Sequence, residues 1–322
     1  MAARKLDGKT DVGAWKDENI LSIAQFGKES AQRVLNLADE MKSMVKSQGA
    51  NDLLQGKLLA NVFFEPSTRT SSSFQSAMLR LGGKVVCVNE TSSSSQKGET
   101  LGDTIRCLEC YADVVVLRHP VKGSALVAAE STKKPVLNAG DGVGEHPTQA
   151  MLDLYTIYSE FGDLENLKGK VITMVGDLKY GRTVHSLSKL LAMYGTTFNY
   201  VSPESLKMPR YVYDELAAQG IQQNETSDLD SVINQSDVLY VTRVQKERFE
   251  SEADYNAVKD SFCITKATIA QAKPTMIIMH PLPRVGEIAE EVDSDPRAAY
   301  FRQMENGMYV RMALLALVLG KA

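Results

Sequence analysis

The sequence predicts an α/β protein of two domains, each with a parallel sheet flanked by helices, and with helices linking the domains. Short apolar runs, many rich in β-branched residues, recur along the chain, and apolar residues at helical spacing follow most of them. Glycine, hydroxyl and charged residues stand where these runs end, which is the edge at which parallel sheets bind ligands. A length of 322 residues suits two domains of ordinary size.

Composition narrows the classes of function. With 43% hydrophobic and 24% charged residues, the chain is typical of a soluble globular protein. A net charge of −4 gives no reason to expect a nucleic-acid partner. No signal peptide is visible at Met1, and the apolar tail at 312–319 is too short to cross a bilayer, so we expect no membrane partner.

The four cysteines follow neither a disulfide nor a zinc pattern. Cys107 and Cys110 form a lone C-x-x-C, without the second pair or the nearby histidines that a zinc site needs. Both fall on one face of a helix predicted at 101–111, and we expect them to be buried structural thiols. Few cysteines in no pattern favour a reducing compartment, so we expect a cytoplasmic location.

The first elements follow a polar lead-in. Residues 1–17 are polar and irregular, and they predict a flexible linker. The span 31–45 carries apolar residues on one helical face, and the apolar run 58–64 predicts a buried strand. Apolar residues at helical spacing over 74–81 predict the helix that follows this strand.

The segment between this strand and this helix predicts a phosphate-binding turn. A strand that turns into a helix leaves N–H groups at the helix start, and these groups favour an anion. Ser67, Thr68 and Thr70 add hydroxyl donors, and Arg69 adds a planar charged fork. The alternative is an ordinary helix cap, with Ser67 or Thr68 as the N-cap and no ligand.

The alternation of strand and helix continues beyond this turn. A second short strand is predicted at 84–88, and the β-branched run 112–117 predicts another that ends at Arg118. The segment 91–99 between them has no apolar residue, which is typical of a solvated connector. Lys97 beside a glycine is the feature that favours a function for this segment.

The next strand leads into a glycine-rich turn. It is predicted at 135–140, and the glycines that follow it allow a close approach to a ligand. Pro147 suits the first turn of a helix. His146 and Gln149 are three residues apart, so both can point the same way from the start of that helix. A lone histidine is usually structural, and both roles remain open for His146.

The second half repeats the arrangement after a polar boundary at 161–170. The run 171–175 predicts a strand, and its C-terminal loop 176–183 places Arg182 at the start of a helix, where it suits an anion. The loop lacks G-K-[ST] and G-x-G-x-x-G, which excludes a Walker ATP site and disfavours a dinucleotide site.

Three further strands are predicted in this half, at 197–201, 238–241 and 276–279. The second ends in the charged loop 242–248, and the third ends in a loop at 280–284 that contains two prolines. Each loop by itself is typical of a solvated connector. Both follow strands of one predicted sheet, at the edge where ligands bind.

These segments resemble the aspartate/ornithine carbamoyltransferase family. The run 63–70 resembles its carbamoyl-phosphate signature, and 146–149 matches a second family motif. The segments 176–186, 242–248 and 280–284 resemble the aspartate branch. An ornithine enzyme is expected to carry His-Cys-Leu-Pro where this chain has His-Pro-Leu-Pro.

The resemblance extends over residues 18–320. The serines at 71–73 and the loop 96–99 are most similar to the aspartate carbamoyltransferase domain of multifunctional eukaryotic pyrimidine-synthesis proteins. The chain is then expected to be one domain of a larger polypeptide, with other domains as possible partners. The implied domains are a carbamoyl-phosphate-binding domain at 18–160, on which a C-terminal helix at about 305–322 packs, and an aspartate-binding domain at 161–304.

The resemblance implies a role for each matching residue. Those implied to bind carbamoyl phosphate are Ser67, Thr68, Arg69, Thr70, Arg118, His146 and Gln149, with Ser93 and Lys97 contributed by a neighbouring subunit. Those implied to bind aspartate are Lys97, Arg182, Arg243, Gln245 and the backbone of Leu282 and Pro283. The implied catalytic donors are Thr68, Arg118 and His146. Glu65 and Arg248 are implied to bridge the domains on closure.

The implied reaction is attack of the α-amine of L-aspartate on the carbamoyl carbon, with phosphate as the leaving group. The product is N-carbamoyl-L-aspartate, in de novo pyrimidine synthesis, and the active unit is implied to be a homotrimer with shared active sites. Both substrates are anions, and arginine matches carboxylate and phosphate oxygens with two bonds. No cofactor and no metal are expected.

Three alternatives remain. Another carbamoyltransferase could act on ornithine or a similar amine, although Arg243 and Gln245 favour an acidic substrate. An inactive relative could bind a phosphorylated metabolite without turnover, although every required motif position is present. A nucleotide-binding oxidoreductase is disfavoured by the missing glycine fingerprint.

Overall fold

A computed structural model describes residues 5–6, 14–89, 98–246, 249, 251–259 and 261–322. The chain divides into two compact units. Unit 1 comprises Met1–Tyr155 and Glu305–Ala322, and unit 2 comprises Thr156–Met304. The N-terminal part of unit 1 therefore ends near the predicted boundary at 160.

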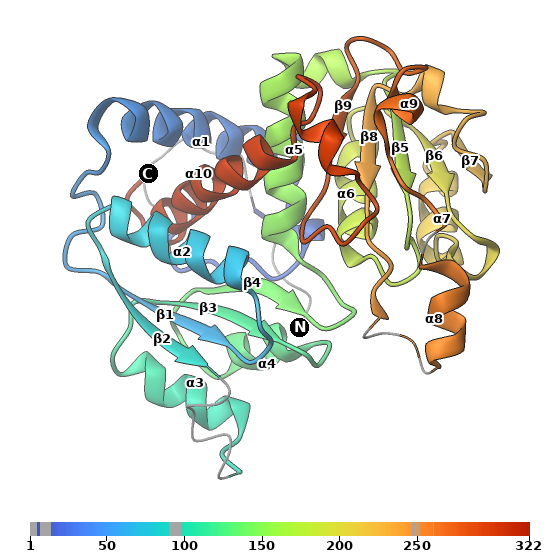
Figure 1. Ribbon diagram of the computed structural model, residues 1–322. Coiled ribbons are helices and arrows are strands. Elements are labelled where there is room, and N and C mark those ends of the chain that lie inside the picture. Colours follow the sequence, from blue (N-terminus) through green and yellow to red (C-terminus); the bar gives the residue numbers. More distant parts are fainter. Residues whose placement is uncertain (1–4, 7–13, 90–97, 247–248, 250, 260) are drawn as a thin grey trace. The chain divides into compact units, whose positions relative to one another are not determined.

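Unit 1 is built on a four-stranded parallel sheet with the order β2-β1-β3-β4 (Figure 1). The strands are β1 (Leu58–Phe63), β2 (Lys84–Asn89), β3 (Val114–His119) and β4 (Val136–Asp141). The inner strands β1 and β3 are largely buried, and their apolar sequences suit burial on both faces. β2 lies at an edge of the sheet, and most of its side chains are exposed.

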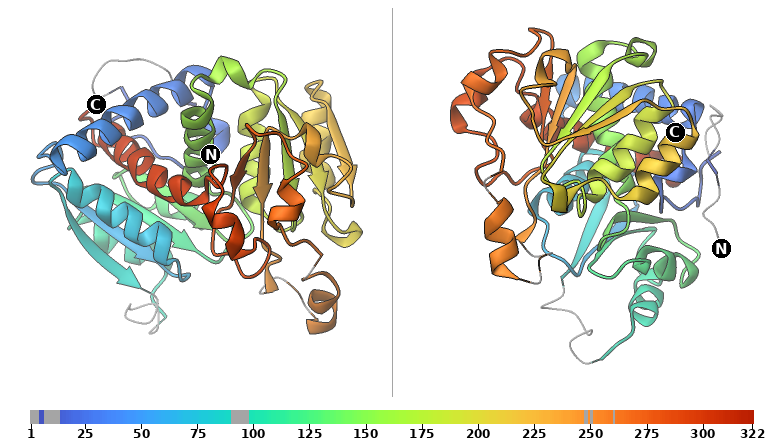
Figure 2. Two further views of the ribbon diagram at one scale, coloured as in Figure 1. Left: turned by 45° about the horizontal axis from the view of Figure 1, so that its top comes forward. Right: turned by 90° about the vertical axis from the view of Figure 1, so that its right-hand side faces the viewer.

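Helices cover both faces of this sheet (Figures 1 and 2). The helices of unit 1 are α1 (Lys28–Gln48), α2 (Thr68–Arg80), α3 (Leu101–Glu109), α4 (Ser124–Glu130), most of α5 (Pro147–Phe161) and most of α10 (Tyr300–Val318), with a short 3-10 helix at Ile23–Gln25. α3 and α4 cover one face, where Ile105 and Ala128 join a buried cluster with Val62 and Val115. α1, α2 and α10 lie on the other face.

The described part of the N-terminal segment is packed, so the prediction of a flexible lead-in is wrong for residues 14–17. Trp15 is 1% exposed and packs edge-on against Phe26, with ring centroids 6.0 Å apart. The Asp17 N–H donates to the Val318 carbonyl at 3.0 Å. Burial of the large indole removes much apolar surface from water, and this free energy orders the polar residues beside it.

The prediction that Cys107 and Cys110 are buried is also wrong. Both thiols are exposed. The face of α3 that packs against the sheet carries Thr104, Ile105 and Leu108 instead. The two cysteines are three residues apart and do share a face of the helix, but that face points away from the sheet.

Unit 2 holds a five-stranded parallel sheet with the order β7-β6-β5-β8-β9. The strands are β5 (Val171–Val175), β6 (Thr197–Val201), β7 (Gln223–Thr226), β8 (Val238–Val241) and β9 (Ile277–Met279). The helices are α6 (Arg182–Ala192), α7 (Arg210–Ala218), α8 (Glu252–Val258) and α9 (Lys266–Ile269), with 3-10 helices at Leu164–Leu167, Glu204–Leu206, Ile233–Gln235 and Glu290–Ser294.

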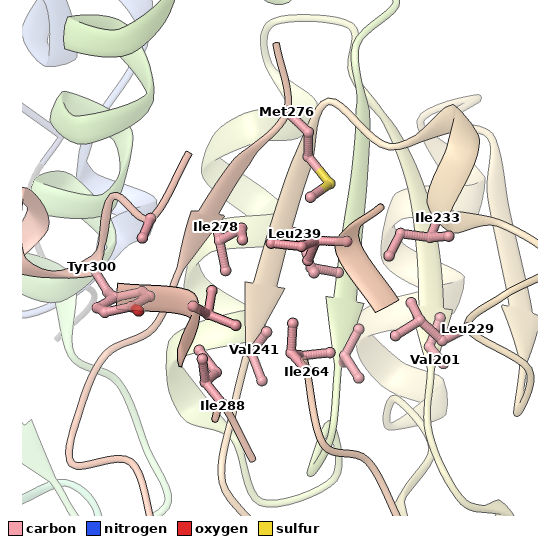
Figure 3. Close-up of a cluster of buried hydrophobic side chains, with 14 of the residues drawn as sticks. Val201, Leu229, Ile233, Leu239, Val241, Ile264, Met276, Ile278, Ile288 and Tyr300 are labelled. Carbon is pink, nitrogen blue, oxygen red and sulfur yellow. The ribbon is translucent and has the colours of Figure 1, made fainter. Parts of the chain in front are cut away.

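Figure 3 shows the apolar core on one face of this sheet. Its labelled members include Val201, Leu239, Val241 and Ile278 from the strands, and Ile264 and Ile288 from the segments that cover them. Met174 in β5 points to the opposite face, where its sulfur accepts a hydrogen bond from Ser188 of α6. Alternate residues of β5 therefore bury opposite faces of the sheet, as expected for a strand covered on both sides.

The strand orders bring particular loops together. The order reverses between β1 and β3 in unit 1 and between β5 and β8 in unit 2. Open α/β sheets bind ligands at the carboxyl ends of strands where the order reverses. Phe63 pairs with Arg118, and Val175 pairs with Val241, so the loops after each pair of strands start side by side.

Candidate active site

The start of α2 lacks a side-chain cap. Ser67 occupies the N-cap position, and its hydroxyl makes no capping hydrogen bond. The Ser67 side chain therefore does not satisfy the first N–H groups of α2, and the helix dipole favours an anion there. Thr68 and Arg69 are exposed at this turn, whereas Thr70 is buried. This arrangement favours the predicted phosphate-binding turn over the ordinary helix cap.

Two buried polar side chains anchor α2 to the rest of unit 1. Asn61 in β1 donates from Nδ2 to the Ser71 hydroxyl at 3.0 Å. Arg311 in α10 donates from Nη1 to the Ser73 hydroxyl at 2.7 Å, and its guanidinium lies 5.1 Å from the centre of the Phe74 ring. Both contacts fall in the first two turns of α2, so they fix the position of its N-terminus.

Gly307 makes room for the Arg311 side chain. A Cβ at position 307 would lie 2.8 Å from Arg311 Nη1 and 3.1 Å from Leu152. Burial lowers the pKa of Arg311 to about 9, a shift that Asp153 opposes and Arg118 reinforces. The guanidinium is therefore still charged at neutral pH, and it adds a fixed positive charge close to the start of α2, where phosphate binding is predicted.

Arg118 lies at the end of β3 and pairs with Glu65. Its Nη2 lies 3.1 Å from Glu65 Oε1, and its Nη1 donates to the Ala139 carbonyl at 3.4 Å. Arg118 Nε and Glu65 Oε2 are buried and have no hydrogen-bond partner among the residues that the structure describes. The role of Glu65 in domain closure stays a prediction. The structure shows Glu65 as the neighbour of Arg118 within unit 1.

His146 and Gln149 come together at the start of α5. They are 3% and 6% exposed. Gln149 donates from Nε2 to Asp153 Oδ1 at 2.9 Å, one turn further along the helix, and this bond orients its amide. Asp153 is fully buried. Asp153 was not predicted as a site residue, because nothing in its own segment marks it; the hydrogen bond to Gln149 identifies it.

The turn before His146 is held by Asp141. Its carboxylate accepts from the Glu145 N–H at 2.7 Å and from the Gly123 N–H at 2.9 Å. Gly142 has a φ of +58°, and a Cβ there would lie 2.2 Å from the Pro120 carbonyl oxygen. The glycine is therefore required for the close approach of the loops after β3 and β4.

In unit 2, Gly176 and Asp177 join the loops that follow β5 and β8. Gly176 has a φ of +114°, and a Cβ there would lie 2.2 Å from the Thr242 carbonyl oxygen. Asp177 accepts from the Tyr180 N–H at 2.9 Å and from the Gln245 N–H at 3.3 Å. Burial raises the pKa of Asp177, and these two donors oppose the rise. Asp177 was missed in the sequence analysis.

The predicted aspartate-binding side chains gather around these loops. Arg182 is the first residue of α6, and the N-cap residue Gly181 provides no side chain to the N–H groups there. Gln245 donates from Nε2 to the Tyr180 carbonyl at 3.1 Å. Arg243 is half-buried and close enough to lower the pKa of Asp177 by its charge.

Leu282 and Pro283 follow β9, which pairs with β8 through Met279 and Tyr240. Leu282 has a φ of +56°, and the peptide bond to Pro283 is cis. The Leu282 N–H donates to Nδ1 of the buried His280 at 2.8 Å. Their loop therefore starts beside the loop that carries Arg243, which follows β8, and on the same edge of the sheet as the loop after β5 that leads to Arg182.

Within each unit, the predicted residues that the structure describes lie at or just after the carboxyl ends of the parallel strands. Ser93, Lys97 and Arg248 lie outside the described residues. Within the described ranges, no group of three or more His, Cys, Asp and Glu side chains is placed to hold a metal ion. In the same ranges, no helix has the length and apolar character needed to span a bilayer.

Two family models match the chain. Residues 18–159 match the carbamoyl-P binding domain of aspartate/ornithine carbamoyltransferase, and residues 168–318 match its Asp/Orn binding domain. Together they match more than half of the chain.

Named relatives and a solved structure agree with this match. Multifunctional protein pyr1-3 of Dictyostelium discoideum is 57% identical over 94% of this chain, which spans only 14% of that protein's length. The aspartate carbamoyltransferase catalytic subunit of Thermococcus onnurineus is 49% identical over 95% of this chain and 98% of its own length. Aspartate transcarbamoylase of Trypanosoma cruzi, in complex with carbamoyl phosphate and aspartate, has a TM-score of 0.91 and 45% identity over 98% of this chain and 100% of that chain.

Proposed function

Because the chain belongs to the aspartate/ornithine carbamoyltransferase family, we propose that it transfers the carbamoyl group of carbamoyl phosphate to the α-amine of L-aspartate. The products are N-carbamoyl-L-aspartate and phosphate, in de novo pyrimidine synthesis. The observation that carries the proposal is that anion-binding side chains stand where the strand order reverses in both sheets.

Unit 1 supplies the groups proposed to bind carbamoyl phosphate. They are the α2 turn with Ser67, Thr68, Arg69 and Thr70, and the side chains of Arg118, His146 and Gln149. Thr68, Arg118 and His146 donate to the carbamoyl oxygen as negative charge builds on it. Each such donor contributes on the order of 3 kcal/mol to transition-state stabilisation.

Unit 2 supplies the groups proposed to bind aspartate. They are Arg182, Arg243, Gln245 and the backbone of Leu282 and Pro283. Two arginines suit a substrate with two carboxylates, because the guanidinium fork bonds to both oxygens of a carboxylate. An ornithine side chain carries a positive charge that Arg243 would repel. The arginines therefore favour aspartate over ornithine as the acceptor of the carbamoyl group.

We further propose that the active unit is a homotrimer in which Ser93 and Lys97 act in a neighbouring subunit's site. The edge strand β2 precedes this segment, and its Val86 is 43% exposed; Leu79 of α2, a helix that contacts β2, is 51% exposed. An edge with exposed apolar side chains suits contact with another chain. A cytoplasmic location is proposed from the four free thiols.

The first test is product formation from carbamoyl phosphate, with aspartate and ornithine as parallel acceptors. Carbamoyl aspartate from aspartate alone is expected. Product from ornithine would keep the family and overturn the role of Arg243. No product from either acceptor, in folded protein, would favour an inactive binding protein.

A second test addresses the shared site. Lys97→Ala and Arg69→Ala chains are each expected to be inactive. Mixed trimers of the two are expected to regain part of the activity, because one shared site in the trimer then receives both intact residues. Absence of recovery in verified mixed trimers would contradict a shared site.

A further inference from the structure

His280 closes a continuous chain of hydrogen bonds around the loop that follows β9. The Leu282 N–H donates to His280 Nδ1 at 2.8 Å. On the other side of the ring, His280 Nε2 lies 2.6 Å from Glu287 Oε1. Glu287 Oε2 in turn accepts from the Val285 N–H at 2.9 Å. One imidazole and one carboxylate therefore hold two amides of the same loop.

This geometry fixes the tautomer of His280. A backbone N–H can only donate, so Nδ1 must be the acceptor and must carry no proton. The proton of the neutral ring then sits on Nε2 and is donated to Glu287. An imidazolium would carry protons on both nitrogens, and its Nδ1–H would face the Leu282 N–H. The contact between His280 and Leu282 therefore exists only while the ring is neutral.

The backbone of His280 is held as well. His280 is 1% exposed, and its own N–H donates to Oε1 of the fully buried Gln303 at 2.9 Å. Leu282, by contrast, has a φ of +56°, a conformation that a non-glycine residue keeps only when its surroundings hold it. The buried His280 side chain thus supports backbone in a conformation that needs such support.

We propose that His280 is a positioning residue that, through Leu282 and Glu287, sets the backbone of Leu282 and Pro283 that receives the acidic substrate. The proposal rests on the proposed function of unit 2. It adds a residue that touches neither substrate and acts through the amide it holds.

The charges around His280 decide when the contact is lost. Glu287 favours the protonated ring, whereas burial and the positive charges of Arg243 and Arg284 oppose it, and the net effect lowers the pKa of His280 below 6.5. The contact should therefore persist at neutral pH and break on acidification. Aspartate binding should weaken as the pH falls.

The experiment compares His280→Leu with His280→Asn. Leucine removes the acceptor for the Leu282 N–H. Asparagine can still accept from the N–H two residues on, as in an Asx turn, but it does not titrate. KM for aspartate and KM for carbamoyl phosphate are measured for each variant and for the parent chain from pH 5.5 to 8, a range chosen to include about 6.5.

We expect His280→Leu to raise KM for aspartate at least about tenfold, which corresponds to about 1.4 kcal/mol. KM for carbamoyl phosphate should stay within about twofold, since its proposed site is on unit 1. His280→Asn should lie closer to the parent at neutral pH. It should also lose part of the rise in KM for aspartate that the parent shows on acidification.

Three outcomes would overturn the proposal. The first is an unchanged KM for aspartate in His280→Leu. The second is an equal rise of both KM values in both variants, which indicates a general structural role. The third applies if His280→Leu does not fold: KM for aspartate then changes with pH in His280→Asn as it does in the parent chain. A parent chain that forms no carbamoyl aspartate refutes the proposed function instead, and this result is distinguishable because it needs no variant.

Discussion

Replacement of Asp177 by asparagine tests what holds the loops of unit 2 that are proposed to bind aspartate. Asp177 is fully buried between the loops that follow β5 and β8. One carboxylate oxygen accepts from the Tyr180 N–H at 2.9 Å, and the other accepts from the Gln245 N–H at 3.3 Å. Asparagine has nearly the same shape but only one acceptor oxygen, so one of these two amides loses its partner.

The expected magnitude follows from that loss. A buried N–H left without an acceptor costs about 1–3 kcal/mol. If the loop relaxes to restore the bond, Gln245 and the neighbouring Arg243 move from their positions. We therefore expect Asp177→Asn to raise KM for aspartate by about 10-fold or more, at about 1.4 kcal/mol per tenfold. KM for carbamoyl phosphate should change by less than about twofold, because its proposed site is on unit 1.

Asp237→Asn is the matched control. Asp237 is 6% exposed and lies at the opposite edge of the same sheet, just before β8. It accepts from the Val171 N–H at 2.9 Å and pairs with Lys170 and Lys273 at 3.2 and 3.1 Å. Its replacement should lower the free energy of unfolding without changing KM for aspartate.

The assay is steady-state carbamoyl aspartate formation, with urea denaturation of each variant in parallel. The reasoning is refuted if Asp177→Asn keeps its KM for aspartate within about twofold of the parent while losing about 1–3 kcal/mol of stability. It is equally refuted if Asp237→Asn raises that KM as much as Asp177→Asn does. Either result would mean that Asp177 contributes to stability alone.

Two further predictions concern stability. Gly307→Ala places a Cβ 2.8 Å from Arg311 Nη1, and this overlap should lower the free energy of unfolding by about 1–3 kcal/mol, of which the better helix propensity of alanine offsets up to about 1 kcal/mol. Urea denaturation measures the loss, and most of it should disappear in an Arg311→Met background. A loss that persists in that background would contradict the steric cause. Burial lowers the pKa of both His185 and His280 below 6.5, so the unfolded chain binds protons first and stability should fall as the pH drops below that value. Urea midpoints at pH 7.5 and about 5.5 measure this loss of stability. If His185→Asn and His280→Asn lose as much stability between these pH values as the parent chain does, other groups cause the loss.

Sequence patterns predicted the main elements because hydrophobic periodicity survives without knowledge of the fold. The strands at 197–201 and 238–241 occur as predicted, and the start of α5 at Pro147 follows from the fixed φ of proline. β7 was missed because its sequence, Gln223–Thr226, is polar and it forms only by pairing with β6. The cysteine pair was misplaced because spacing shows that two residues share a face and does not show which face is buried.

The sequence alone predicted which residues bind the substrates, because glycines, hydroxyls and arginines concentrate after apolar runs. It also determined the family, through motifs such as 63–70 and 280–284. Tertiary structure decided how these motifs meet. Strand order depends on long-range pairing, and only that order places the end of β1 beside β3 and the end of β5 beside β8.

The residues that support the site were likewise visible only in three dimensions. Asp153 and Arg311 approach each other from α5 and α10, which are distant in the sequence, and Asp177 connects two loops through backbone amides. A backbone N–H carries no sequence signature, so a side chain that holds one cannot be recognised from residue types. Local composition therefore determines what a strand end can bind, and burial against distant segments decides which side chains hold it in position.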